Sequence, residues 1–193
     1  MSATYTISIP EWIDRIFTRP LMIYRKFKYG CGYRRIYLGE GEYTKVDADI
    51  FYRLGGLRWQ IKGNGKRWYV VRFKKVRPGL TTLENLHRVI IKARKGRVVD
   101  HLNCDPLDNC RMNLRQATQS QNHQNVLKKK NTSSKYIGVS FRKEIKKWGA
   151  YTSHKGKKKH LGYFLNEIDA ARAYDKAVKK YFGPYARVNF AKN

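Results

Sequence analysis

Acidic residues are scarce in this chain of 193 residues, which has 14 Asp and Glu against 42 Lys and Arg and a formal net charge of +28. This imbalance concerns what the chain binds, because a strongly basic surface attracts polyanions, and nucleic acid is the commonest polyanion inside cells. A solvated basic surface and an anionic membrane are the alternatives that charge alone leaves open. The charge therefore favours a nucleic-acid partner and leaves the fold undecided.

Cysteines and long apolar runs are also few. Cys31, Cys104 and Cys110 are odd in number, which argues against a disulfide framework. No apolar run approaches the roughly 18 residues of a membrane-spanning helix, so we expect no integral membrane protein. The N-terminus lacks the basic-then-apolar order of a signal peptide, which predicts a cytoplasmic protein. A hydrophobic fraction of 41% indicates folded modules, and the length allows one domain or two small ones.

We expect residues 1–42 to be a basic arm. Ile9, Ile13 and Ile16 recur at helical spacing and predict a short amphipathic helix. The basic residues and tyrosines that follow suit an arm lying along phosphates, although a solvated basic face is the alternative.

Residues 43–128 mix helix and strand signals and form the first expected domain. VDADIFYRLGG predicts a helix between Asp47 and Gly55, and the runs on either side of GNG predict a hairpin. LENLHRVIIKA fits either a strand or a short helix. RVVDHL and NLRQAT read as strands, and Thr118 with Gln121 predicts a capping box that opens a helix through QSQNHQNVL.

A polar, basic linker at 129–134 separates this domain from a second one at 135–190. KYIGVSFR, WGAYTSH and KKKHLGYF read as three short strands, and the helix that follows begins after Asn166 and ends at Gly183. Its apolar stripe comprises Ile168, Ala171, Tyr174, Val178 and Tyr181. From residue 126 onward, 18 Lys and Arg face 4 Asp and Glu. A domain so small and so basic requires an anionic partner. The fold class we expect is α+β.

The stretch VVDHLNCDPLDN places Asp100 and His101 at the end of a strand, followed by Asn113 and Asn122. Phosphodiester hydrolysis needs an aimed, deprotonated water, which a neutral imidazole such as His101 can supply. It also needs charge neutralisation, which a hard divalent ion held by Asp100 and the Asn122 carbonyl oxygen can supply. Asn113 can hydrogen-bond across the loop. The alternatives are a capped strand end without chemistry, turn asparagines, and a zinc site using Cys104.

The residues DH, DN…NLR and QNHQN, at these spacings, resemble the HNH motif of the ββα-metal superfamily, in particular the phage and mobile-intron homing endonucleases. The resemblance implies Asp100 and Asn122 as ligands of Mg²⁺ (or Mn²⁺), His101 as general base, and Asn113 as the residue that braces the loop. That subgroup usually has Arg at the position of Cys110. Arg111 is the candidate to replace it.

The sequences KYIGVSF, KKWGAY, HLGYF and EIDAARAYDKAVKKYFGPYARVNF resemble the plant-type ethylene-response-factor DNA-binding domain (apetala-two type), which the resemblance implies is a three-stranded antiparallel sheet packed on one helix. Strand alternation places Trp148, Ala150 and Thr152 on one face, and the resemblance implies that this face packs on the helix. Of the outward side chains, Arg142 suits guanine and Lys158 a phosphate. The full set of expected DNA-binding residues is Ser140, Arg142, Lys147, Tyr151, Ser153, Lys158, His160, Arg111 and Arg115.

The sequence thus predicts an N-terminal hairpin region with an HNH nuclease core, linked to a DNA-binding domain. The expected function is a site-specific homing endonuclease that nicks duplex DNA as a monomer with one divalent metal and without a membrane or protein partner. The first alternative is a sequence-specific DNA-binding regulator with an inactive nuclease site. The second is an RNA-binding or ribosome-associated protein.

Overall fold

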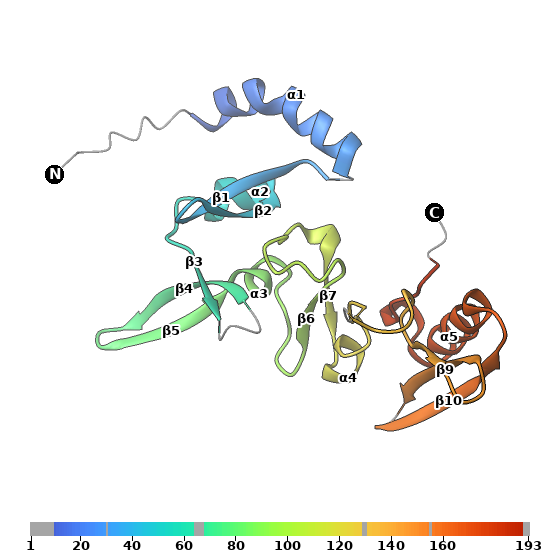
Figure 1. Ribbon diagram of the computed structural model, residues 1–193. Helices are drawn as coiled ribbons and strands as arrows, with labels where there is room; N and C mark the ends of the chain where they lie inside the picture. Colours follow the sequence, from blue (N-terminus) through green and yellow to red (C-terminus); the bar gives the residue numbers. More distant parts are fainter. Residues whose placement is uncertain (1–9, 30, 64–67, 129–130, 155, 191–193) are drawn as a thin grey trace. The chain divides into compact units, whose positions relative to one another are not determined.

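The structure, a computed structural model, describes residues 10–29, 31–63, 68–128, 131–154 and 156–190 (Figure 1). The chain divides into two compact units, of which the first comprises Met1–Lys95 with His101–Gln116 and the second Gly96–Asp100 with Ala117–Asn193. No helix in the described ranges is long and apolar enough to cross a membrane. The domain boundaries and the cytoplasmic location expected from the sequence stay predictions.

The first unit is built from small antiparallel sheets and short helices. Strands β1 and β2 pair with each other, and β3, β4 and β5 form a sheet in that order. Its elements up to residue 95 are α1 (Glu11–Tyr29), β1 (Tyr33–Gly39), β2 (Glu42–Asp47), α2 (Ala48–Leu54), β3 (Gln60–Gly63), β4 (Trp68–Arg77), β5 (Leu80–Asn85) and α3 (Leu86–Ile90).

The N-terminal region contains a longer helix than the sequence predicted, and the basic arm expected over residues 1–42 stays a prediction. Helix α1 runs for 19 residues through Pro20, and strand β1 follows it. The Arg34 guanidinium of β1 donates to Asp14 Oδ2 at 2.7 Å and so ties the helix to the strand. Much of the apolar surface of α1 faces solvent, with Phe27 93% exposed. Pro20 lies inside this helix, and a proline within a helical pattern ordinarily marks a helix boundary, so the sequence indicated only a short helix.

Several local predictions for the first unit are confirmed. Helix α2 begins after Asp47 and ends before Gly55. Strands β3 and β4 pair antiparallel with Gln60 opposite Val71, while the GNG turn lies largely outside the described residues. The ambiguous stretch LENLHRVIIKA contains both alternatives, since β5 ends at Asn85 and α3 starts at the next residue.

The predicted strand, loop, strand and helix are present as β6 (Val98–His101), η1 (Arg111–Asn113), β7 (Leu114–Ala117) and α4 (Gln119–Asn122). Strands β6 and β7 form a two-stranded sheet. Both bonds of the predicted capping box are present: the Gln121 amide donates to Thr118 Oγ1 and the Thr118 amide to Gln121 Oε1. Helix α4 is shorter than expected. This order of elements alone does not establish an HNH core.

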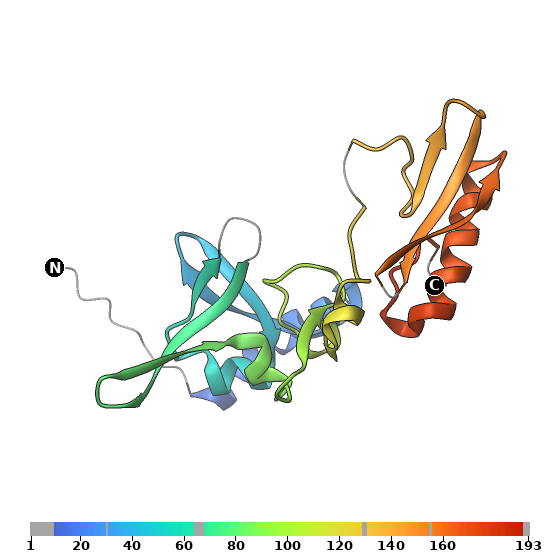
Figure 2. The same ribbon diagram turned by 90° about the horizontal axis from the view of Figure 1, so that it is seen from below.

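The second unit contains β8 (Val139–Arg142), β9 (Lys147–His154), β10 (Lys157–Phe164), α5 (Glu167–Phe182) and η2 (Gly183–Tyr185). The three strands form an antiparallel sheet in the order β10-β9-β8, and α5 lies along one face of it (Figure 2). Its core joins Val139 and Ala150 of the sheet to Ala170 and Ala171 of the helix. The chain is therefore of mixed α and β type with antiparallel sheets, as the α+β class predicts.

The apolar stripe of α5 is partly as expected. Ala171, Tyr174 and Val178 are buried, but Ile168 is 46% exposed and Ala170 takes its place in the core. The two residues differ by about 200° around a helix of 3.6 residues per turn, so the buried face is centred away from Ile168.

Candidate nucleic-acid interface

The Asp100 and His101 side chains are both buried and both bonded within the protein. They are the last two residues of β6, so the strand ends where the sequence predicted. Asp100 is 3% exposed, and its Oδ1 accepts a hydrogen bond from Asn125 Nδ2 at 2.8 Å. His101 is 8% exposed, and its Nε2 lies 3.3 Å from Asn109 Oδ1.

Asn113 makes the bonds across the loop that the sequence suggested. Its Oδ1 accepts from the Asn103 amide at 2.9 Å, and its Nδ2 donates to the Asp108 carbonyl at 2.7 Å. These bonds fix the loop between β6 and β7. Such a structural role is compatible with a catalytic site and equally with its absence.

Asn122 is the last residue of α4, and the amide that reaches Asp100 belongs to Asn125 instead. Sequence reasoning missed Asn125, although it lies in the same QNHQN stretch. Among the described residues, no three or more His, Cys, Asp and Glu side chains gather into a metal site. The Mg²⁺ site at Asp100 and Asn122, with His101 as base, therefore stays a prediction.

Arg111 and Cys110 have partners in the first unit. The Arg111 guanidinium pairs with both carboxylate oxygens of Asp49, and this bond holds the pKa of the Asp49 carboxyl below its usual value. Arg111 is thus engaged by a carboxylate where a phosphate contact was expected. Cys110 is 1% exposed and its Sγ lies 3.5 Å from Cys31 Sγ. Arg115 is half-buried on β7.

Cross-strand register brings the other seven expected DNA-binding residues to one face of the β8–β10 sheet. Opposite residues of an antiparallel pair share a face, and alternate residues along a strand do so as well. The observed pairs are Ser140 with Gly149, Arg142 with Lys147, Tyr151 with His160, and Ser153 with Lys158. On the opposite face, Ala150 and Thr152 are buried and Trp148 packs against the core shared with α5, as predicted.

The same surface includes Tyr163, which the sequence did not indicate. Simple alternation from His160 would place residue 162 outward and Tyr163 toward the core. A register shift between His160 and Gly162, where Gly162 has φ +130°, reverses this order and pairs Tyr163 with Gly149. Its ring lies 4.3 Å from that of His160. We call this surface the β-sheet face; its residues are Ser140, Arg142, Lys147, Tyr151, Ser153, Lys158, His160 and Tyr163.

Tyr151 lies at the centre of the β-sheet face and organises its cations. Arg142 Nε donates to the Tyr151 hydroxyl at 3.1 Å, and Lys158 Nζ lies 4.4 Å from the ring centroid. Burial acts to raise the pKa of Tyr151, but the hydrogen bonds from Arg142 and Tyr163 outweigh it and lower the pKa. The hydrogen bond with Tyr151 raises the pKa of Arg142, which stays cationic.

A missing side chain at Gly149 lets the Tyr151 ring lie flat along the sheet. A Cβ at Gly149 would come within 2.7 Å of Tyr151 Cε2 and 2.8 Å of its hydroxyl oxygen. The glycine therefore sets where the hydroxyl that accepts from Arg142 is held. The result is an exposed, cationic and aromatic surface suited to a polyanion.

Part of the chain is similar to plant transcription factors of the AP2/ERF type. It is 38% identical over 68 residues to "Dehydration-responsive element-binding protein 2A" of Oryza sativa subsp. indica, covering 33% of this chain and 23% of that protein. It is 41% identical over 58 residues, 30% of this chain, to "AP2-like ethylene-responsive transcription factor TOE2" of Arabidopsis thaliana and "APETALA2-like protein 2" of Oryza sativa subsp. indica, covering 12% and 13% of those proteins. The chain thus spans less than a quarter of the length of these relatives. No family model matches it.

These names correct the main functional prediction from the sequence. They support the DNA-binding domain of the expected pair and give no support to an HNH endonuclease. The prediction of a homing endonuclease, and with it the assignment as a hydrolase or phage nuclease, is wrong by this comparison, because the named relatives are transcription factors. The spacing of Asp100, His101 and Asn113 was given too much weight: the bonds that these side chains make hold a strand and a loop, which needs no chemistry. The comparisons favour the alternative, a sequence-specific DNA-binding regulator.

Proposed function

We propose that this protein is a sequence-specific DNA-binding regulator whose β-sheet face binds the major groove of duplex DNA. The observation that carries the proposal is the cross-strand register, which gathers Arg142, Lys147 and Lys158 with an aromatic cluster on the one face of the sheet that α5 does not cover. The relatives named as a DNA-element-binding protein and as transcription factors point to the same class of partner.

The charge pattern of the β-sheet face favours an anionic partner. Arg142 and Lys147 are directly opposite each other on neighbouring strands, and like charges so placed destabilise a sheet. A phosphate between or beside them offsets this repulsion. Because this repulsion is present in the free protein and offset in the complex, it favours binding. Long-range attraction from the net charge of +28 also speeds the encounter with DNA.

The roles we assign follow from side-chain geometry. Arg142 presents a planar fork of donors that matches O6 and N7 of guanine in the major groove. Lys147 and Lys158 act as point charges for phosphates. Tyr151 holds the Arg142 guanidinium through its hydroxyl, so it positions the base-reading residue. Ser140, Ser153 and His160 offer neutral hydrogen bonds around this centre.

Selection of bound duplexes from a random pool tests the proposal. We expect wild-type protein to enrich one motif containing guanine, and Arg142→Lys to relax preference at that guanine while keeping the charge. Duplex RNA should compete poorly, because its deep, narrow major groove does not admit the sheet. Enrichment of no motif, or equal binding of duplex RNA, would contradict the proposal.

A plasmid assay addresses the regulator assignment directly. Supercoiled plasmid carrying the selected motif, incubated with the protein and Mg²⁺, should stay supercoiled. Relaxation by wild-type protein that is lost in His101→Ala would contradict a purely regulatory role.

A further inference from the structure

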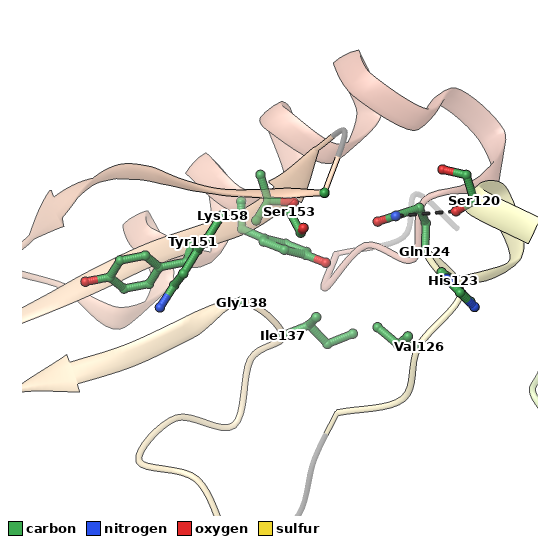
Figure 3. Close-up of a pocket in the computed structure, with 12 residues that line it drawn as sticks. Ser120, His123, Gln124, Val126, Ile137, Gly138, Tyr151, Ser153 and Lys158 are labelled. Carbon is green, nitrogen blue, oxygen red and sulfur yellow. Dashed lines mark hydrogen bonds between the residues drawn. The ribbon is translucent and has the colours of Figure 1, made fainter.

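A cavity of about 480 Å³ lies beside the β-sheet face, within the second unit. One wall is the segment of Ser120, His123 and Gln124, and the other wall is formed by β9 and β10 with Ser153 and Lys158 (Figure 3). We call this cavity the α4 groove. Its volume is in the range of ligand-sized pockets, so it can admit part of a nucleotide backbone.

The chemistry of the α4 groove suits an anion. Its lining combines hydroxyl, amide and imidazole groups with the apolar side chains of Val126 and Ile137, and none of its described lining residues is acidic. The Lys158 Nζ lies over the Tyr151 ring, 4.4 Å from its centroid. Gln124 Nε2 donates to the Ser120 carbonyl at 3.4 Å, a long bond that a better acceptor can replace. Hydroxyl and amide side chains are among the groups that contact phosphate oxygens in DNA complexes.

The α4 groove is continuous with the β-sheet face, because Tyr151, Ser153 and Lys158 belong to both. A strand whose phosphates contact Lys158 on the sheet can therefore continue along the groove, past Val126 and Ile137, toward His123 and Gln124. We propose that the α4 groove is a phosphate-binding site that extends the DNA contact from the β-sheet face onto the segment Ser120–Gln124. This inference rests on the proposed function and adds a second contact to it.

The segment is held firmly enough to act as a fixed binding surface. The capping box of Thr118 and Gln121 closes its start. Past its end, Asn125 Nδ2 donates to Asp100 Oδ1 at 2.8 Å, and the Arg187 amide donates to the Gln124 carbonyl at 3.3 Å. A backbone fixed on both sides loses little conformational entropy on binding, which favours a positioned contact over a loose one.

Two isosteric substitutions provide a matched test. Gln124→Glu places a carboxylate inside the α4 groove, whereas Gln60→Glu makes the same charge change on β3 of the first unit, outside the groove lining. On a duplex that extends well past the selected motif on both sides, we expect Gln124→Glu to weaken binding about tenfold at low salt, since like charges in contact repel. Gln60→Glu should change binding less than about twofold, because its carboxylate lies outside the groove and Coulomb repulsion falls with distance. Equal thermal unfolding of the two variants shows that both are folded.

Duplex length and footprinting give a second readout. On a duplex trimmed to the motif, Gln124→Glu and wild type should bind alike. On the long duplex, the hydroxyl-radical footprint of Gln124→Glu should lack the wild-type protection at one end of the site only. If Gln124→Glu and Gln60→Glu bind the long duplex equally and give the same footprint, the α4 groove is not a DNA contact. That result leaves the proposed function standing as long as Arg142→Lys still relaxes the motif. If Arg142→Lys and Gln124→Glu are both silent, the proposed function fails as well.

Discussion

The salt dependence of DNA binding offers the sharpest test of the β-sheet face. Binding that neutralises phosphates releases condensed counterions, so the logarithm of the association constant falls linearly with the logarithm of salt concentration. The β-sheet face presents three cations, Arg142, Lys147 and Lys158, on one side of the sheet. Each that contacts a phosphate adds one step to the slope.

Replacing one of these cations should therefore lower the slope by a fixed amount. Lys158→Gln keeps a long polar side chain and removes one charge, so the slope should become shallower by about 0.9. Raising the salt concentration from 50 to 200 mM weakens binding, and a slope shallower by about 0.9 makes that loss of affinity about 3.5-fold smaller. Removing Lys147 and Lys158, the two side chains assigned to phosphates, should change it by about 12-fold, which is two such steps.

The control is a cation of the same unit on the helix behind the sheet. Lys176 is exposed on α5, so Lys176→Gln removes the same net charge without touching the β-sheet face. Fluorescence anisotropy titrations of a labelled duplex at four salt concentrations yield both slopes. If the two single variants shift the slope equally, net charge rather than the β-sheet face drives binding, and the assignment of this face is wrong.

Three further predictions concern stability and metal. Gly138→Ala should destabilise the second unit by about 2 kcal/mol or more in urea unfolding, because φ is +74° and the new Cβ would lie 2.1 Å from Tyr174 Cδ2. Gly156→Ala, at φ +73° with nothing within 4 Å, should cost only the backbone part, about 1 kcal/mol. Burial lowers the pKa of His87 to about 3, so on acidification the unfolded chain binds this proton before the folded chain does. The free energy of unfolding should therefore fall by about 1.4 kcal/mol for each unit by which the pH is lowered from about 6.5 to 3. His87→Phe should remove this contribution, and an unchanged pH dependence would contradict it. Addition of EDTA should leave the affinity for the selected duplex unchanged, since no metal enters the proposed contacts.

The second unit was the more predictable part of the fold, because its signals are local. Strand alternation in WGAYTSH placed Ala150 and Thr152 on one face, and the family resemblance identified that face as the one packed on the helix, where both residues are buried. Thr118 and Gln121 stand three residues apart, the spacing that a capping box needs. Tyr163 was missed because the register shift before Gly162 reverses the alternation of inward and outward side chains. A single glycine in the sequence does not predict such a shift.

The loop and helix after β6 show where spacing alone misleads. The position of Asn122 suggested a side chain aimed at Asp100, but α4 ends at Asn122 and the turn beyond it brings Asn125 to the carboxylate. Where a helix of four residues ends depends on its tertiary contacts rather than on its propensity. Arg111 likewise reads as a phosphate contact until Asp49, 62 residues earlier, is found at its guanidinium.

The scarcity of acidic residues acquires a structural meaning once their partners are known. Many of the few carboxylates are engaged inside the fold, where each fixes an arginine, a hydroxyl or a backbone amide. The pairs are Asp14 with Arg34, Asp49 with Arg111, Glu84 with Arg72, Glu167 with Ser134, and Asp175 with the Asn189 amide. Three of these carboxylates, Asp14, Asp49 and Glu84, offset arginines of the scaffold, while no member of the β-sheet face is acidic and Arg142, Lys147 and Lys158 lie on it together. Net charge alone would attract any polyanion. Because these carboxylates are bonded within the fold and the cations are gathered on the β-sheet face, this face favours an anionic partner.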